Sequence, residues 1–452
     1  MLSNTPLLLE RNAAIYPDSA LASTINSTSV QLLKYGVWAY FLLIIFEGAL
    51  RKWFFPSLAT PLLVIRDPLA LWLLLATWKR GLLPANPYMT IMLVIGGLSL
   101  FTAALLGHGS LTVALFGARI LFLHFPLIFV IGQVFNRDDV LKIGKFTLWL
   151  AVPMVVLIAV QFYSPQSAFV NRGIGGDLAG AGFDGALGFF RPPGTFSFTT
   201  GNASYFSMLA LFLFYFWVNN RSINKLLLLL AALALVVAIP LCVSRTLLFQ
   251  LLITLGFLLI AVAQKPTYWL RTLLAAMAVL IVLTLLEQTS FFTLATKVFS
   301  TRFETANKIE GGLQGVVLDR FLGGMLGPLT GSARLPFFGY GIGMGTNVGS
   351  MLLSGTRTFL IAEEEWGRIV GELGPLMGIG VIFIRVKLAW KLTVACYQRM
   401  TEGDLLPWML LSFGLLNLVQ GGWAQPTSLG FCTLISGLII ASFRLPAPRR
   451  VA

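Results

Sequence analysis

Residues 225–243 read KLLLLLAALALVVAIPLCV, an almost continuous apolar run whose one charged residue stands at its start. A helix rises about 1.5 Å per residue, so a run of this length crosses the hydrocarbon core of a bilayer, which is about 30 Å thick. Residues 268–286 form a second run of the same kind. Over the whole chain 57% of the residues are hydrophobic and 11% are charged, against about 25% charged in soluble domains. These features predict an all-α polytopic membrane protein.

About twelve transmembrane helices are expected from the apolar runs. They are placed at residues 36–50, 61–78, 88–106, 112–134, 140–163, 201–218, 225–243, 246–263, 268–288, 366–384, 405–420 and 427–443. Residues 1–33 are polar and lack the basic region, apolar stretch and cleavage site of a signal peptide. They are predicted to form a cytoplasmic N-terminal tail, and residues 34–452 a single membrane domain.

The positive charge of the chain follows this predicted topology. A net charge of +14 would by itself suit nucleic-acid binding, but the basic residues gather in every second connection between spans. Short cytoplasmic loops collect Lys and Arg in this way. The pattern therefore predicts that both termini are cytoplasmic, and it argues against nucleic acid as a partner. The residues concerned are Lys79, Arg80, Arg137, Lys142, Lys145, Arg221, Lys225, Lys265, Arg271, Arg385, Lys387, Lys391, Arg399, Arg444, Arg449 and Arg450.

Two connections are long, residues 164–200 and residues 289–364, and the topology puts both on the outer face. The second lies between the ninth and tenth spans and opens with an amphipathic stretch. Long loops are uncommon unless they have a function, so we expect the site here. The glycine run GYGIGMG at 339–345 lacks the βαβ context of a dinucleotide site. It predicts a tight turn or a close approach of the backbone to a polar ligand.

Ionisable residues inside the predicted spans gather in the outer third of the bilayer. Glu47, Arg66, Asp67 and Arg119 form this supporting group. Each costs about 2.5–3.5 kcal/mol to insert, which makes such residues functional candidates. They also suit a helix-pairing network, for example Asp67 with Arg119, and both interpretations stay open. Lys52 is expected to be an interfacial anchor.

Metal and cofactor sites are not predicted. His124 has no second histidine near it and is expected to be a core histidine. Cys242, Cys396 and Cys432 show no metal-ligand spacing and are expected to be small core residues. No G-x-x-x-x-G-K-[ST] motif occurs, which argues against ATP-driven transport by this chain alone.

Two arginines stand apart from these groups. Arg191 precedes two prolines, and Arg245 lies at the turn between two apolar spans. Arginine matches phosphate oxygens with a fixed planar fork, so arginines at the outer boundary suit a lipid diphosphate. The run Glu363, Glu364 and Glu365 can supply a general base for an acceptor hydroxyl. A solvated helix N-terminus is the alternative interpretation of this acidic run.

Several segments carry a resemblance to a known family. They are RPPGTFSFTTGNASYF from residue 191, VSRTLL from 243, FFGYGIGMG from 337 and EEEWGRIVGELGPLMGIGVIFI from 363. Together they resemble the O-antigen polymerase and O-antigen ligase superfamily, membrane glycosyltransferases of the GT-C type. FEGALRKWFFP from residue 46 looks like a motif of a bacterial polysaccharide-related branch. The resemblance covers nearly the whole chain, but each motif is short and degenerate.

The resemblance implies Arg191 and Arg245 as diphosphate-binding residues, with Arg320 as a third. It also implies a bacterial inner membrane location. Because the sequence has no cluster of metal ligands, the reaction is expected to need no metal. The ligase branch carries a histidine just before the tenth span, where this chain reads IAEEE at 361–365. That departure favours a polysaccharide polymerase, which transfers a glycan from polyprenyl diphosphate to the hydroxyl of a lipid-linked repeat unit. A chain-length regulator is the protein partner that such an activity implies.

Two other functions are kept as alternatives. The first is a ligase that moves the glycan onto a lipid or protein acceptor. The second is a flippase for lipid-linked oligosaccharides, which needs charged residues along a path through the whole membrane. Most predicted spans carry no ionisable residue in their inner half, which argues against the flippase.

Overall fold

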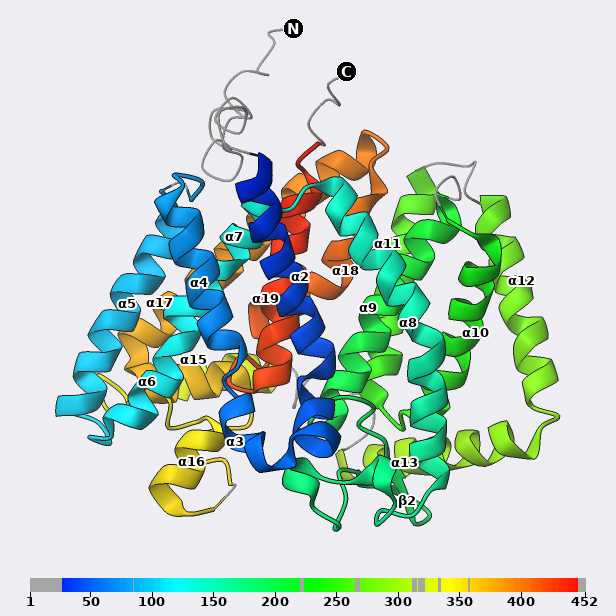
Figure 1. Ribbon diagram of the computed structural model, residues 1–452, viewed down its shortest axis with the longest axis horizontal. Coiled ribbons are helices and arrows are strands. Elements are labelled where there is room, and N and C mark those ends of the chain that lie inside the picture. The colour runs from blue at the N-terminus through cyan, green and yellow to red at the C-terminus, as the bar shows by residue number, and fades with distance from the viewer. Residues whose placement is uncertain are drawn as a thin grey trace, which may run out of the picture.

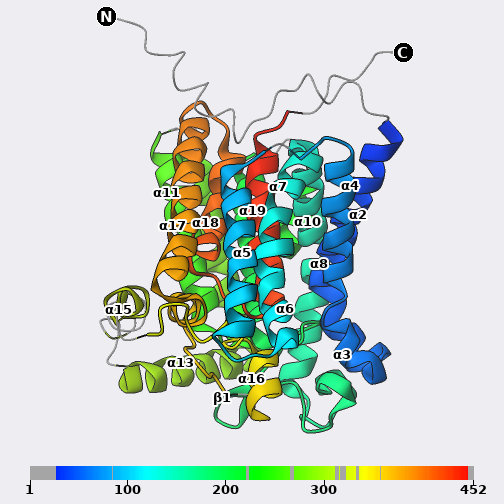
Figure 2. The same cartoon turned by 90° about the vertical axis from the view of Figure 1, so that its left-hand side faces the viewer.

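The structure, a computed structural model, describes residues 27–83, 85–219, 223–264, 269–310, 315, 322–331, 335–356 and 358–445. Its long helices run side by side as a bundle (Figures 1 and 2). α2 (Ser27–Ala49) begins and α19 (Pro426–Ser442) ends on one side of this bundle, which we call the terminal face. The two long connections lie on the opposite side, the loop face.

Eight helical stretches in the described part of the chain are long and apolar enough to cross a membrane. They are Val30–Phe54, most of it in α2; Pro56–Lys79, with α3 (Ala59–Leu62) and α4 (Arg66–Lys79); α5 (Pro87–Leu105); Leu111–Val134, with α6 (Leu111–Arg119) and α7 (Phe125–Val134); α8 (Arg137–Tyr163); α9 (Thr199–Val218); α11 (Arg245–Gln264); and α17 (Glu365–Thr401). α10 (Lys225–Leu241), α18 (Leu405–Gln420) and α19 are shorter apolar helices, and α12 (Trp269–Leu286) follows α11. The predicted helical class is confirmed, while the number of spans stays a prediction.

Ion pairs join the helices at the terminal face. Lys34 Nζ lies 2.5 Å from Asp139 Oδ2 and connects α2 to α8. Arg137 pairs with Asp404 and connects α8 to α18. The first helix begins at Ser27, so its first turns lie within the segment predicted as a tail, residues 1–33. Lys34 lies inside this helix, because lysine is a good helix former, and its charge is paired with Asp139.

The tenth predicted span needs a larger correction. It was expected to end at residue 384, with Arg385 in a cytoplasmic connection, but α17 continues to Thr401. Arg385 is buried inside this helix and pairs with Glu365. A paired charge can remain in the bundle, so it did not mark the end of the span. α17 is also broken at Gly374, whose φ of 77° and ψ of 173° are not helical, just before Pro375.

The first long loop, between α8 and α9, contains the sheet of the described structure. β1 (Phe183–Ala186) and β2 (Phe189–Arg191) are antiparallel, and Phe183 lies opposite Arg191. Leu187 and Gly188 connect them with positive φ angles of 53° and 79°, as in the tight hairpin turns whose twist matches that of strands.

The second long loop contains α13 (Ser290–Glu310), α15 (Gly323–Gly331) and α16 (Asn347–Ser354). α13 lies across the ends of the spans at the loop face (Figures 1 and 2). Phe292, Ala295 and Val298 are buried at spacings of three, while Phe291 and Leu294 are exposed. This one-sided burial confirms the amphipathic helix predicted at the start of the loop.

Candidate functional site

Arg191 stands at the end of β2, and the residues after it are held against α8 and α9. Gln161 of α8 accepts a hydrogen bond from the Gly194 amide at 2.8 Å. Asn202 of α9 donates to the Pro192 carbonyl at 3.2 Å. The Arg191 guanidinium lies over the Phe183 ring at 5.9 Å, across the hairpin. The RPPG segment is therefore a fixed turn and not a free loop.

Arg245 begins α11 directly after a strained turn. Val243 has a φ of 46°, a conformation that β-branched residues rarely adopt. Strain of this kind gathers at functional sites, where the surrounding structure holds it. The Ser244 hydroxyl accepts from the Leu247 amide at 3.4 Å and so caps the first turn of α11. The turn places Arg245 close enough to Arg191 for their charges to interact.

α13 brings a third guanidinium to the same place, that of Arg302. Phe303, next in the chain, lies with its ring 6.3 Å from that of Phe249, one turn after Arg245 on α11. α13 also packs on β1, the strand paired with Arg191. Three segments far apart in sequence therefore converge, and we call Arg191, Arg245 and Arg302 the arginine cluster.

The electrostatics of this cluster favour an anion. Burial, and then the guanidinium groups of Arg302 and Arg245, lower the pKa of Arg191. Its Nε is buried and has no hydrogen-bond partner among the described residues. Neighbouring like charges and an unsatisfied buried donor both oppose folding, and a bound polyanion relieves both. An arrangement of this kind therefore attracts an anion.

The sequence prediction named two members of this cluster and missed the third. It paired Arg191 and Arg245 with Arg320, which lies outside the described residues. Arg302 was detectable, because it follows Ala295 by seven positions and precedes Ala306 by four, and both alanines are buried. Those spacings put Arg302 on the inner face of an amphipathic helix.

The acidic run at the start of α17 divides into two parts. Glu363 and Glu364 are exposed, whereas Glu365 is buried. Glu365 accepts from Arg368 Nη2 at 2.8 Å and from Arg385 Nη1 at 2.8 Å. Both of its oxygens are occupied by guanidinium donors, because Oε2 also accepts from Arg368 Nε at 3.1 Å. Of the three, the two exposed carboxylates are the ones that solvent or a substrate can reach.

The same ion pairs fix the glycine run of the second long loop. Arg368 Nη1 lies 2.5 Å from Glu372, whose other oxygen accepts from the Gly345 amide at 2.8 Å. The Tyr340 amide donates to the Gly371 carbonyl at 2.8 Å. The run therefore turns tightly against the break in α17, which agrees with the turn predicted there.

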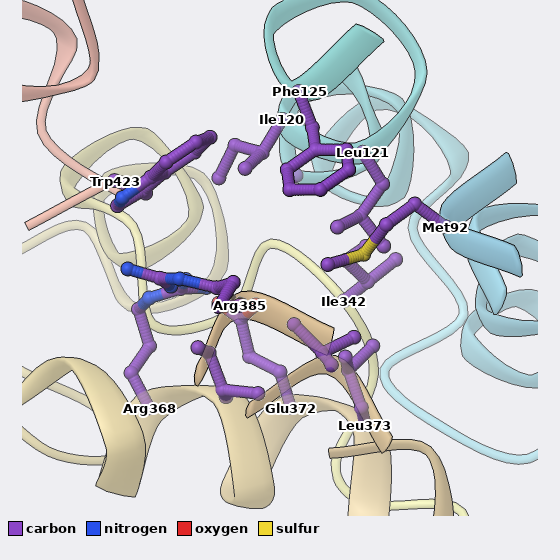
Figure 3. Close-up of a pocket in the computed structure, with 13 residues that line it drawn as sticks. Met92, Ile120, Leu121, Phe125, Ile342, Arg368, Glu372, Leu373, Arg385 and Trp423 are labelled. Atoms are coloured by element: carbon purple, nitrogen blue, oxygen red, sulfur yellow. Dashed lines mark hydrogen bonds and ion pairs between the residues drawn. The ribbon is translucent and has the colours of Figure 1, made fainter. Parts of the chain in front are cut away.

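The charges of α17 enclose only a small cavity (Figure 3). Arg385 and Arg368 lie below the Trp423 ring in this view, and the Arg385 guanidinium is 4.8 Å from that ring. Apolar side chains such as Phe125 and Met92 form the opposite wall. The cavity measures about 20 Å³, room for about one water molecule. The buried charges of α17 therefore pair with one another around a space smaller than a sugar.

The supporting residues predicted inside the spans form ion pairs. Arg119 Nη1 contacts both oxygens of Asp67, at 3.1 and 2.9 Å, as expected for a helix-pairing network. His124 is fully buried between Asp67 and Tyr40, at 2.9 Å from each, which confirms it as a core histidine.

Glu47 joins a second set of charges at the loop face. It lies 3.1 Å from Arg51 and 3.3 Å from Arg66. Arg66 is buried, and its Nε and Nη1 have no partner within the described structure. The prediction of Lys52 as an interfacial anchor was wrong, because the side chain is only 1% exposed and donates to the Gly194 carbonyl at 2.8 Å.

The cysteines and the possible metal ligands of the chain complete the description of the candidate residues. The three cysteines are buried and form no disulfide in the described structure, as predicted for core residues. Within the described ranges, no group of three or more His, Cys, Asp or Glu side chains is placed to hold a metal.

Comparisons with models of known protein families, with curated proteins and with solved structures found no match to this chain.

Proposed function

We propose that this chain is a membrane glycosyltransferase, and specifically a polysaccharide polymerase. Its donor is a glycan on polyprenyl diphosphate, and its acceptor is a hydroxyl of a second lipid-linked repeat unit. The observation that carries the proposal is the convergence of Arg191, Arg245 and Arg302 at the loop face. Three guanidinium groups suit a diphosphate, and the family resemblance of the surrounding motifs supports the same substrate.

The proposed reaction exchanges one bond at the anomeric carbon of the donor. The acceptor hydroxyl oxygen forms a bond to that carbon, and the bond from the carbon to the phosphate oxygen breaks. The polyprenyl diphosphate leaves with the bonding electron pair, and the arginine cluster stabilises the charge that develops on it. Glu363 or Glu364 takes the proton of the acceptor hydroxyl, since both carboxylates are exposed at the loop face.

The proposal includes a topology. About twelve helices cross the bacterial inner membrane, with the terminal face in the cytoplasm and the loop face outside. α12 is then the ninth span and α17 the tenth, and the loop between them carries Arg302. The charged ends of the lipid-linked substrates meet the protein at this outer boundary, while their chains stay in the bilayer.

The acceptor distinguishes this function from its alternatives. Purified protein in liposomes receives a lipid-linked repeat unit, and we expect longer glycans on polyprenyl diphosphate. A ligase would extend nothing and would instead transfer the glycan to an added lipid or protein acceptor. A flippase would move the lipid-linked unit across the bilayer without forming a glycosidic bond, and either result would refute the polymerase.

A further inference from the structure

The motif FEGALRKWFFP at 46–56 has no role in the chemistry described above. Its centre, Leu50–Phe54, is a π-helix that continues α2 toward the loop face. π-Helical segments are rare and often mark functional sites. Three consecutive side chains of this segment, those of Arg51, Lys52 and Trp53, contact the first long loop.

Each of these three side chains holds a different point of that loop. Arg51 Nη1 donates to the Ser197 hydroxyl at 3.1 Å, and Lys52 Nζ donates to the Gly194 carbonyl at 2.8 Å. The Trp53 ring stacks on Phe169 with 6.4 Å between centroids. The residues contacted are Phe169, which precedes Arg191 in the sequence, and Gly194 and Ser197, which follow it.

The backbone of the loop also passes directly against α2. A side chain at Gly48 would collide with the backbone of residues 195–197. The Thr195 hydroxyl donates to the Ile45 carbonyl at 2.6 Å. Gly48 therefore allows the loop backbone to approach α2 closely, and the hydrogen bonds of Arg51 and Lys52 hold the loop there.

The burial of Lys52 in this contact is not explained by a gain in the stability of the fold. Lys52 is 1% exposed and makes no ion pair with any described residue. Its ammonium lies 4.7 Å from the Trp53 ring and reaches one carbonyl. A buried cation without a carboxylate partner costs free energy, and an apolar side chain of equal length would avoid that cost.

We propose that Lys52 is a positioning residue for Arg191. Gly194, which Lys52 holds, follows Arg191 after two prolines, whose fixed φ angles transmit the position of one end of the segment to the other. The inference rests on the proposed function, since it assumes that Arg191 binds a diphosphate. Lys52 has no exposed surface with which to bind the substrate itself.

The test compares affinity and stability in one variant. Lys52→Met keeps the length of the side chain and removes its charge and hydrogen bond. We expect the affinity for farnesyl diphosphate, measured by titration of the purified protein, to fall at least about tenfold, because one charge-assisted hydrogen bond no longer positions the loop. We expect Tm to stay the same or rise. Lys297→Met, which removes an exposed charge of α13, is the matched control and keeps wild-type affinity.

A double-mutant cycle shows whether Lys52 acts through Arg191. If it does, Lys52→Met with Arg191→Lys loses no more affinity than Arg191→Lys alone. Additive losses, or wild-type affinity in Lys52→Met, would overturn the inference. If Lys52→Met lowers the folded yield, Lys52→Gln, whose shorter polar side chain cannot reach the Gly194 carbonyl in the same way, decides instead, and unchanged affinity there overturns the inference. Absence of diphosphate binding by the wild type would refute the proposed function itself, which is a separate outcome.

Discussion

At the scale of single residues, the proposed chemistry depends on the arginine cluster. Replacement of Arg191, Arg245 or Arg302 by Lys keeps the charge and removes the planar fork that matches two phosphate oxygens. We expect turnover to fall by about 10²–10³ for each variant, the usual loss when a donor to transition-state charge is removed. Glycan length on a gel, normalised to folded protein, measures this. Lys297→Arg serves as the control, and unchanged ladders in all three arginine variants would remove the site assignment.

A second test concerns the acidic run, in which Glu365 is buried and Glu363 and Glu364 are exposed. Glu365 pairs with two buried arginines, so Glu365→Gln leaves their charges without full compensation. We expect this variant to lose about 3–5 kcal/mol of stability. Glu363→Gln and Glu364→Gln should unfold like the wild type, and whichever residue acts as the base should show reduced turnover. Thermal unfolding and the gel assay separate the two effects, and full activity in both exposed variants would exclude a base in this run.

At the scale of elements, the glycine run is bound tightly to its neighbours. Gly343 has a φ of 93°, and a side chain there would collide with the Val113 carbonyl. We expect Gly343→Ala to cost at least about 1–3 kcal/mol and to lower the folded yield. Gly327 in α15 has no described atom within 4 Å of an added side chain, so Gly327→Ala is the control. Equal yields of the two variants, measured by size-exclusion chromatography, would contradict the role of the turn.

The elements also show what sequence reasoning can and cannot reach. Apolar runs locate helices closely, as for α18, because the length of a run and its flanking polar residues are local signals. The end of α17 was missed because Arg385 is neutralised by Glu365, twenty positions earlier in the chain. Lys52 was misplaced because the carbonyl to which it donates lies in a loop more than a hundred residues away, so no local pattern shows the contact. Charges signal exposure only when nothing distant pairs with them.

At the scale of the whole molecule, the proposed topology gives a direct labelling test. Ser300 is exposed on α13, the helix at the loop face, and the three native cysteines are buried. Thr401 is exposed at the end of α17, three residues before Asp404, which pairs with Arg137 at the terminal face. We expect a membrane-impermeant maleimide to label Ser300→Cys in intact cells and to label Thr401→Cys only after the membrane is opened. The reverse result would place the arginine cluster in the cytoplasm and remove the proposed substrates.

The central claim is that this chain forms glycosidic bonds by transferring a glycan from polyprenyl diphosphate, which is released. The most direct measurement is chain growth by purified protein in liposomes that contain a lipid-linked repeat unit, with EDTA present and ATP absent. The account predicts a ladder of longer glycans and one polyprenyl diphosphate released for each bond formed. Lack of growth, or growth only after a divalent metal or ATP is added, would contradict it.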